Sequence, residues 1–162
     1  MTWSIERIWA VVPVPVLVLD RLPGRLVGLS LGILVLVRRD YAADRPTMVH
    51  ELEHCKQFWR GGVVVHMVRY YFDAGYRLRS EVQAFQAELL SCHPDRRDER
   101  LDEAARSLAT GYHLGLDVDD CRELLECYPP SAASWMISRP DAVLPSTSSP
   151  PVTARSIDST AP

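Results

Sequence analysis

The sequence predicts an α+β fold in which short antiparallel strands near the N-terminus pack on a mainly helical core. Two runs rich in valine and leucine, 11–19 and 26–37, are interrupted by proline or glycine and favour short strands over helices. From about residue 44 onward, apolar residues instead recur with helical spacing between typical helix caps and breakers. Strands followed by a block of helices are the pattern of an α+β domain.

Length and composition predict one folded domain followed by a polar tail. The chain has 162 residues, of which 47% are hydrophobic, and this is enough for one core. We place the domain at residues 1–130, because residues 131–162 are rich in Ser, Thr, Pro and Ala and hold too few large apolar residues to order themselves. The net charge of −3 gives no indication of nucleic-acid binding.

No secretory signal is evident, and both apolar runs are shorter than the roughly 20 residues of a membrane-spanning helix. We therefore expect a cytoplasmic protein, and attachment to a membrane surface through the apolar N-terminal third is the less favoured alternative. The cysteines form no C-x-x-C pair and are expected to be free thiols in a reducing compartment. They are Cys55, Cys92, Cys121 and Cys127.

Individual elements are expected from caps, breakers and periodicity. Residues 3–10 are expected as a short helix, and residues 11–19 as an extended segment or edge strand, because Pro13 and Pro15 exclude a helix interior. Short strands are expected on either side of Gly32, at 26–30 and 33–38. Helices are expected from 44–47 to 60, and at 63–74, 81–91 (capped by Ser80), 96–110 and 118–127.

Residues 50–54 form the pattern H-E-x-x-H within the first of the longer helices. On a helix, His50 and His54 lie one turn apart on the same face and can share a metal ion, and zinc prefers nitrogen ligands in a tetrahedral set. The Glu51 carboxylate can then take a proton from a water that the metal activates. The pattern predicts a bound Zn²⁺ and the chemistry of a zinc hydrolase, against the simpler alternative of a surface helix that happens to carry two histidines.

A catalytic zinc usually takes a third protein ligand. The longer pattern H-E-x-x-H-x-x-G-x-x-H is absent, since Gln57 and Arg60 stand where glycine and histidine would be required. Two carboxylates from the following helices are then the candidates, Asp73 and Glu81. Glu81 is favoured, because it opens an expected helix that can pack against the metal helix and because Ala84, one turn later, allows a close approach.

Glu81 and two neighbouring residues also have structural explanations. Without the upstream motif, Glu81 would be explained as a first-turn carboxylate that the helix dipole favours. Glu88, further along the same helix, is expected to face solvent. His66, on an apolar helix, is expected to be a core histidine with its hydrogen bonds satisfied.

The chain resembles the minimal gluzincin-type zinc metallopeptidases, small proteins common in bacterial genomes and prophages. The resemblance covers about residues 26–90. It is carried by the H-E-x-x-H pattern at 50–54 and by Tyr76-x-x-x-x-Glu81-x-x-Ala84 on a later helix.

This resemblance implies a zincin-like core that cleaves peptide bonds in a peptide or protein substrate. It implies His50, His54 and Glu81 as the zinc ligands and Glu51 as general base and acid. It also implies that the strand within residues 32–37 is an edge strand that lines the cleft, where an extended peptide would pair with it.

Two departures from the family pattern weaken the peptidase assignment more than the metal assignment. Gluzincins often carry an acidic residue four positions after the ligand glutamate, where this chain has Phe85. No motif identifies the residue that would stabilise the oxyanion, and the candidates are Tyr70, Tyr71, Tyr76, Tyr112 and His113. The alternative function is therefore a non-catalytic zinc-binding accessory protein with a role in phage or regulatory assembly.

Overall fold

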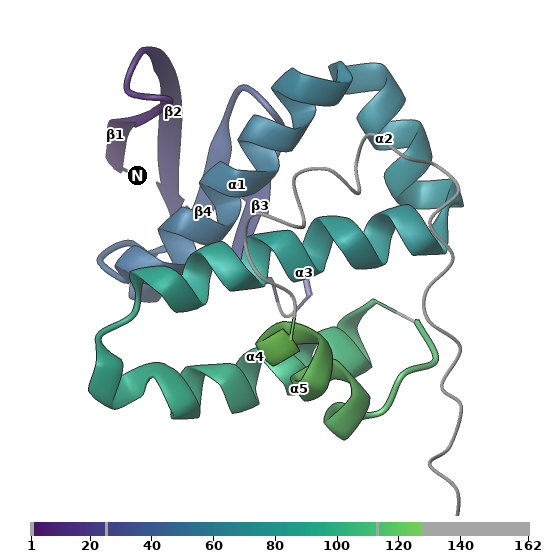
Figure 1. Ribbon diagram of the computed structural model, residues 1–162. Coiled ribbons are helices and arrows are strands. Elements are labelled where there is room, and N and C mark those ends of the chain that lie inside the picture. Colours follow the sequence, from purple (N-terminus) through teal and green to yellow (C-terminus); the bar gives the residue numbers. More distant parts are fainter. Residues whose placement is uncertain (1, 25, 113, 128–162) are drawn as a thin grey trace, which may run out of the picture.

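A computed structural model describes residues 2–24, 26–112 and 114–127 of the chain (Figure 1). The tail expected at 131–162 and the candidate His113 lie outside the described residues. Four strands come first, and the longer helices follow, so the α+β class expected from the sequence is confirmed. The strands are β1 (Thr2–Ile8), β2 (Val12–Leu19), β3 (Gly28–Ser30) and β4 (Val35–Arg38). The helices are α1 (Arg45–Gly61), α2 (Val63–Phe72), α3 (Ala74–Ser91), α4 (Arg97–Gly111) and α5 (Val118–Cys127).

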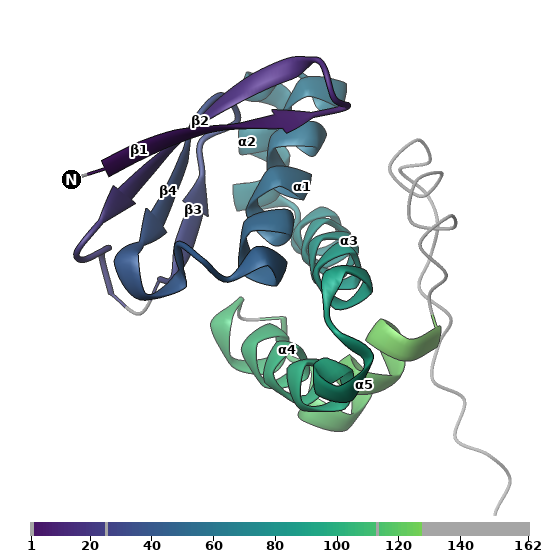
Figure 2. The same ribbon diagram turned by 90° about the vertical axis from the view of Figure 1, so that its left-hand side faces the viewer.

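The four strands form one mixed sheet in the order β1-β2-β4-β3. The pairs β1–β2 and β3–β4 are antiparallel, but β2 and β4 are parallel, so the expectation of purely antiparallel strands is wrong for the central pair. The chain passes from β2 to the far edge of the sheet before β3, and β4 therefore returns beside β2 in the same direction. Figure 2 shows α1 packed against one face of this sheet.

The helix expected at residues 3–10 is wrong. This segment forms the strand β1 and the turn after it. Trp3 and Ile5 alternate with polar residues, which is the two-residue period of a strand. The turn was hard to recognise, because Trp9 and Ala10 adopt positive φ angles of 49° and 61° that are usually left to Gly or Asn.

The strand β2 is internal rather than the edge strand that its prolines suggested. Its register with β4 covers only 16–19, whereas Pro13 and Pro15 pair with β1 alone. Because no strand among the described residues pairs with this part of β2 on the β4 side, the N–H groups that the two prolines lack cost no hydrogen bond there.

The helix α1 begins where expected, with the Asp44 carboxylate accepting a hydrogen bond from the Thr47 backbone N–H at 3.2 Å. By contrast, α3 begins at Ala74 rather than near Glu81. Its cap is Asp73, which accepts from the Tyr76 N–H at 2.8 Å, and not Ser80. Glu81 therefore lies in the middle of a helix, where the first-turn dipole explanation does not apply.

Two apolar cores lie on either side of the α1–α3 interface. The first joins the sheet to α1, and the second joins α3 to α4 and α5. All four cysteines are free, as expected. Among the described residues, none of the helices is both long and apolar enough to cross a membrane.

Candidate metal centre

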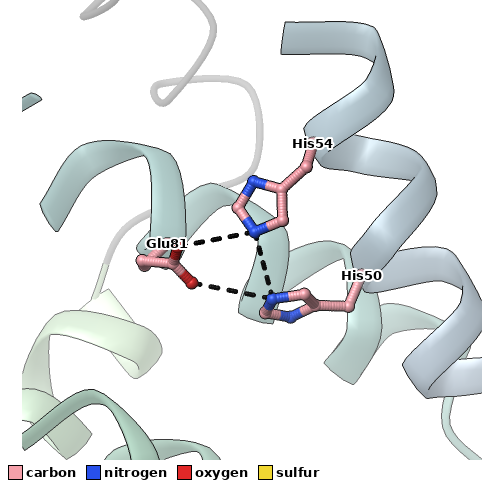
Figure 3. Close-up of side chains that lie close together, drawn as sticks. All are labelled: His50, His54 and Glu81. Atoms are coloured by element: carbon pink, nitrogen blue, oxygen red, sulfur yellow. Dashed lines mark hydrogen bonds and ion pairs between the residues drawn. The ribbon is translucent and has the colours of Figure 1, made fainter. Parts of the chain in front are cut away.

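His50 and His54 project from α1 toward α3, which carries Glu81 (Figure 3). The two Nε2 atoms of the histidines lie 3.2 Å apart. The Glu81 carboxylate faces both, with Oε2 at 3.6 Å from His50 Nε2 and Oε1 at 3.5 Å from His54 Nε2. One ligand atom from each residue lies within 4.8 Å of the others, so the structure brings together the three residues that the sequence singled out as a group that could hold a metal ion.

The other ring nitrogens of both histidines have carboxyl or amide oxygens as partners. His50 Nδ1 lies 2.9 Å from Glu88 Oε2, and His54 Nδ1 lies 3.0 Å from Gln57 Oε1. These oxygens are acceptors, so the Nδ1 atoms donate, and when the rings are neutral, as ligands of a metal would be, the Nε2 lone pairs point toward Glu81. This is the tautomer that a metal ligand requires, and such partners fix the orientation of ligand histidines.

Glu88 is buried, and the expectation that it faces solvent is wrong. It lies seven residues after Glu81, two turns along the same helix face, and supplies the acidic partner that was missing four positions after Glu81. Its second oxygen accepts from Arg100 Nε on α4 at 2.5 Å. Arg100 also donates to Asp44 and Thr47, both at 2.7 Å. A single guanidinium thus connects the partner of His50 to the cap of the helix that carries His50.

Gln57 performs the corresponding role for His54 within a buried polar network. Its amide nitrogen donates to the Ser80 carbonyl at 3.0 Å and to Gln83 Oε1 at 3.4 Å. Its oxygen also accepts from Ser80 Oγ at 2.5 Å. Gln83 in turn donates to Glu53 at 2.8 Å. In the sequence, Gln57 stands out only as a departure from a longer motif, but its place three residues after His54 on a helix is the signal for this contact.

The Glu51 carboxylate is buried next to β3. A Cβ atom added to Gly28 would lie 2.3 Å from Glu51 Oε1, so only glycine leaves room for this side chain. Burial raises the pKa of Glu51, although the neighbouring His50 and His54 oppose the shift. The general-base candidate is therefore held beside the histidines by a close backbone approach.

The chemistry of the cluster fits a divalent cation such as Zn²⁺. Two imidazole nitrogens and one carboxylate form the His₂Glu set of catalytic zinc sites. The Glu81 Oε2 atom is buried and has no hydrogen-bond partner among the described residues, which is costly unless a cation is bound. Burial lowers the pKa of His50, but Glu81 and Glu88 outweigh it and raise the pKa to about 10, so the site strongly favours positive charge. Burial raises the pKa of Glu81, but His54 and His50 lower it overall.

The structure also shows which of the other candidate ligands and tyrosines lie next to the cluster. Asp73 caps α3 and does not belong to the cluster. Tyr70 donates to Glu81 Oε1, and burial and Glu81 together raise the pKa of Tyr112, so both tyrosines lie next to the cluster. Tyr76 instead bonds to His66 Nδ1 at 2.8 Å, and His66 is the buried core histidine that the sequence indicated.

A pocket of about 160 Å³ opens over the cluster and is large enough for several waters or a side chain. His50, Glu51, His54 and Glu81 line it together with Tyr70, Tyr71 and Tyr112. The strand beside this pocket is the edge strand β3, whereas β4 is paired on both sides. The expectation that the strand within residues 32–37 is the cleft-lining edge strand is therefore wrong, because β4 has no free edge to offer a peptide.

Comparisons of the chain with protein-family models, with curated proteins and with solved structures gave no match. What the site can do is therefore inferred from its own residues.

Proposed function

We propose that the protein is a zinc-dependent metallopeptidase of the gluzincin type that hydrolyses peptide bonds. The observation that carries the proposal is that the His50–His54–Glu81 cluster and the Glu51 carboxylate line one pocket beside a free strand edge. A metal site that serves only stability needs neither an adjacent buried carboxylate nor an open side.

His50, His54 and Glu81 would hold the zinc ion, which supplies a Lewis acid for the scissile carbonyl and makes a water molecule more acidic. Glu51 takes the proton of the attacking water and then passes it to the leaving amine. Tyr70 and Tyr112 are the candidates for a hydrogen bond to the carbonyl oxygen, because both lie at Glu81 and line the pocket. The free edge of β3 can pair with an extended peptide through main-chain hydrogen bonds.

The test measures zinc content and peptide hydrolysis on the same preparations of wild type, Glu51→Gln and Glu81→Ala. We expect one zinc per chain in wild type and in Glu51→Gln, hydrolysis of a fluorogenic peptide library only by wild type, and loss of zinc in Glu81→Ala. Asp73→Ala is the matched control, because it also removes a carboxylate from this part of the chain but leaves the cluster intact. Equal hydrolysis by wild type and Glu51→Gln would refute the role of Glu51.

One observation favours the alternative of a non-catalytic zinc-binding accessory protein. Tyr70 donates a hydrogen bond directly to Glu81, which partly closes the cluster from the pocket side. This alternative predicts stoichiometric zinc in wild type and in Glu51→Gln, with no hydrolysis by either, and a large loss of folding stability when zinc is removed.

A further inference from the structure

The helix α2 has an unusual distribution of polar and apolar residues. Its one buried residue is His66, whereas most of its apolar side chains face outward. Val64 is 74% exposed and Phe72 is 87% exposed. Surface helices of soluble proteins bury their apolar side chains, so this arrangement is costly in water and indicates that another apolar phase covers the helix.

The exposed apolar side chains continue from α2 onto three neighbouring segments. We define the apolar face as residues 9–11, 31–33 and 59–72, which lie along the upper side of the molecule in Figure 1. The first and last segments meet where the Arg60 guanidinium lies 5.7 Å from the Trp9 ring. The middle segment meets α2 at the pocket, which Leu31 lines together with Met67 and Tyr71. The surface is therefore continuous across the tips of two strand turns and a helix corner.

The charges on the apolar face are of one sign. Residues 9–11, 31–33 and 59–72 contain Arg60 and Arg69 and no acidic residue, although the whole chain has a net charge of −3. Among the described residues, Arg60 has one long ion pair, of 3.7 Å to Glu53, whereas Arg69 lies 3.9 Å from Asp73 and also stacks over the buried Tyr76 ring at 4.4 Å. The weak ion pair of Arg60 and the exposure of its side chain leave its guanidinium able to bind phosphate.

Tryptophan lies at two points of the face, as in proteins that bind at the boundary between lipid and water. Trp9 is 44% exposed and Trp59 is 50% exposed. Trp9 is presented by a backbone with positive φ, a conformation that costs a non-glycine residue about 1 kcal/mol or more. Strain of this kind is common where a turn has a functional role.

We propose that the apolar face docks the protein on a membrane surface that contains anionic lipids. Valine, tryptophan and phenylalanine side chains enter the region between head groups and acyl chains, and Arg60 contacts lipid phosphates. Leu31, Met67 and Tyr71 belong to this face and also line the pocket. Anionic lipid is the occupant that the charge of the face favours, because the face carries arginine and no acidic residue. The pocket mouth would then open at the lipid surface.

The test is flotation of the full chain with vesicles of phosphatidylcholine alone and of phosphatidylcholine with phosphatidylglycerol. We expect wild type to float with the anionic vesicles, with a bound fraction that falls as salt is raised. The double substitution Val64→Ser with Phe72→Ser should lower the partition coefficient at least tenfold. Both residues are exposed, so the fold should be unaffected, and circular dichroism and thermal melting check this.

Two controls distinguish the apolar face from general stickiness. Leu90→Ser and Trp3→Ser also remove exposed apolar side chains, from α3 and β1, but lie outside the face and should leave flotation unchanged. Glu51→Gln should float like wild type, because the docking does not depend on hydrolysis, so the two proposals can fail separately. Absence of flotation, or equal losses in the controls, would overturn the inference. So would a dimer that the double substitution dissociates in the absence of lipid, since the face would then be a self-association surface.

Discussion

Replacing Arg100 by methionine tests whether a cation from α4 maintains the partner of His50. The Arg100 side chain is 17% exposed, and that of Glu88 is 7% exposed. The distance from Arg100 Nε to Glu88 Oε1 is 2.5 Å, which is shorter than the 2.9 Å between His50 Nδ1 and Glu88 Oε2. Methionine keeps most of the volume of the arginine stem and removes its charge.

The expected cost follows from the burial of Glu88. Removing one partner of a buried ion pair typically costs 3–5 kcal/mol, because the other charge is left uncompensated. Glu88 keeps its hydrogen bond to His50, and Arg100 is partly exposed, so we expect a value near the lower end, about 3 kcal/mol. For a domain of this size, this corresponds to a fall in melting temperature of roughly 10 °C. Zinc affinity should fall about 10-fold to 100-fold, as for other partners of ligand histidines.

A double-mutant cycle with Glu88→Gln identifies the cause. The double variant removes both charges, so its stability loss should be smaller than the sum of the two single losses by at least about 1.5 kcal/mol. Chemical denaturation of zinc-loaded protein provides the free energies of unfolding. Arg122→Met is the control, since Arg122 pairs with Asp102 on the surface and should contribute roughly 1 kcal/mol or less. Additive effects of the Arg100 and Glu88 substitutions, within about 0.5 kcal/mol, would refute the coupling.

Three further predictions concern single residues. Gly28→Ala should displace the Glu51 carboxylate and lower kcat by more than about tenfold while zinc stoichiometry is kept; unchanged hydrolysis would show that Glu51 does not need this position. Asp73→Ala should cost about 1 kcal/mol through loss of a helix cap with unchanged zinc affinity in a chelator competition, whereas Glu81→Ala should abolish tight zinc binding; the reverse order would make Asp73 the ligand. Burial and, to a smaller extent, the nearby His54 lower the pKa of His66 from 6.5 to about 4. The unfolded chain therefore takes up a proton on this histidine at higher pH than the folded protein does. Stability should be full above pH 6.5 and fall between pH 6.5 and 4, by about 3 kcal/mol, and His66→Phe should lack this part of the pH dependence.

The sequence predicted the elements whose signals are local. Asp44 and Pro46 mark the start of α1, and the glycines at 61–62 mark its end, so its bounds could be read directly. The elements that were misassigned depend on tertiary contacts. Only the parallel register with β4 makes β2 internal, and no Asn-Gly signal marked the turn at Trp9. The start of α3 was placed too late, because Ser80 is as good a cap by type as Asp73.

The residues of the candidate metal site could be predicted, but most of those that hold them in place could not. His50 and His54 follow from a fixed motif, and Glu81 from the need for a third ligand on a packed helix. Glu88 was missed because its partner Arg100 lies on a helix with no motif, and a carboxylate without a visible partner is expected to face solvent. The seven-residue spacing from Glu81 was the available signal, since it returns to the same face after two turns.

The α1–α3 interface differs from ordinary helix packing, and this difference itself supports a bound cation. Buried polar side chains join the two helices, whereas α3 meets α4 and α5 through an apolar core. Gln57 bonds to His54 and is itself bonded to Ser80 and Gln83, and Glu88 bonds to His50. Leucine and alanine would join two helices without the cost of desolvating these groups, so the polar interface is best explained by the ligands that it orients. Since Zn²⁺ would bridge His50 and His54 on α1 to Glu81 on α3, its removal should increase amide hydrogen exchange along α1 before it does so along α4. Equal protection of α1 with and without metal would show that the polar network alone holds the two helices together.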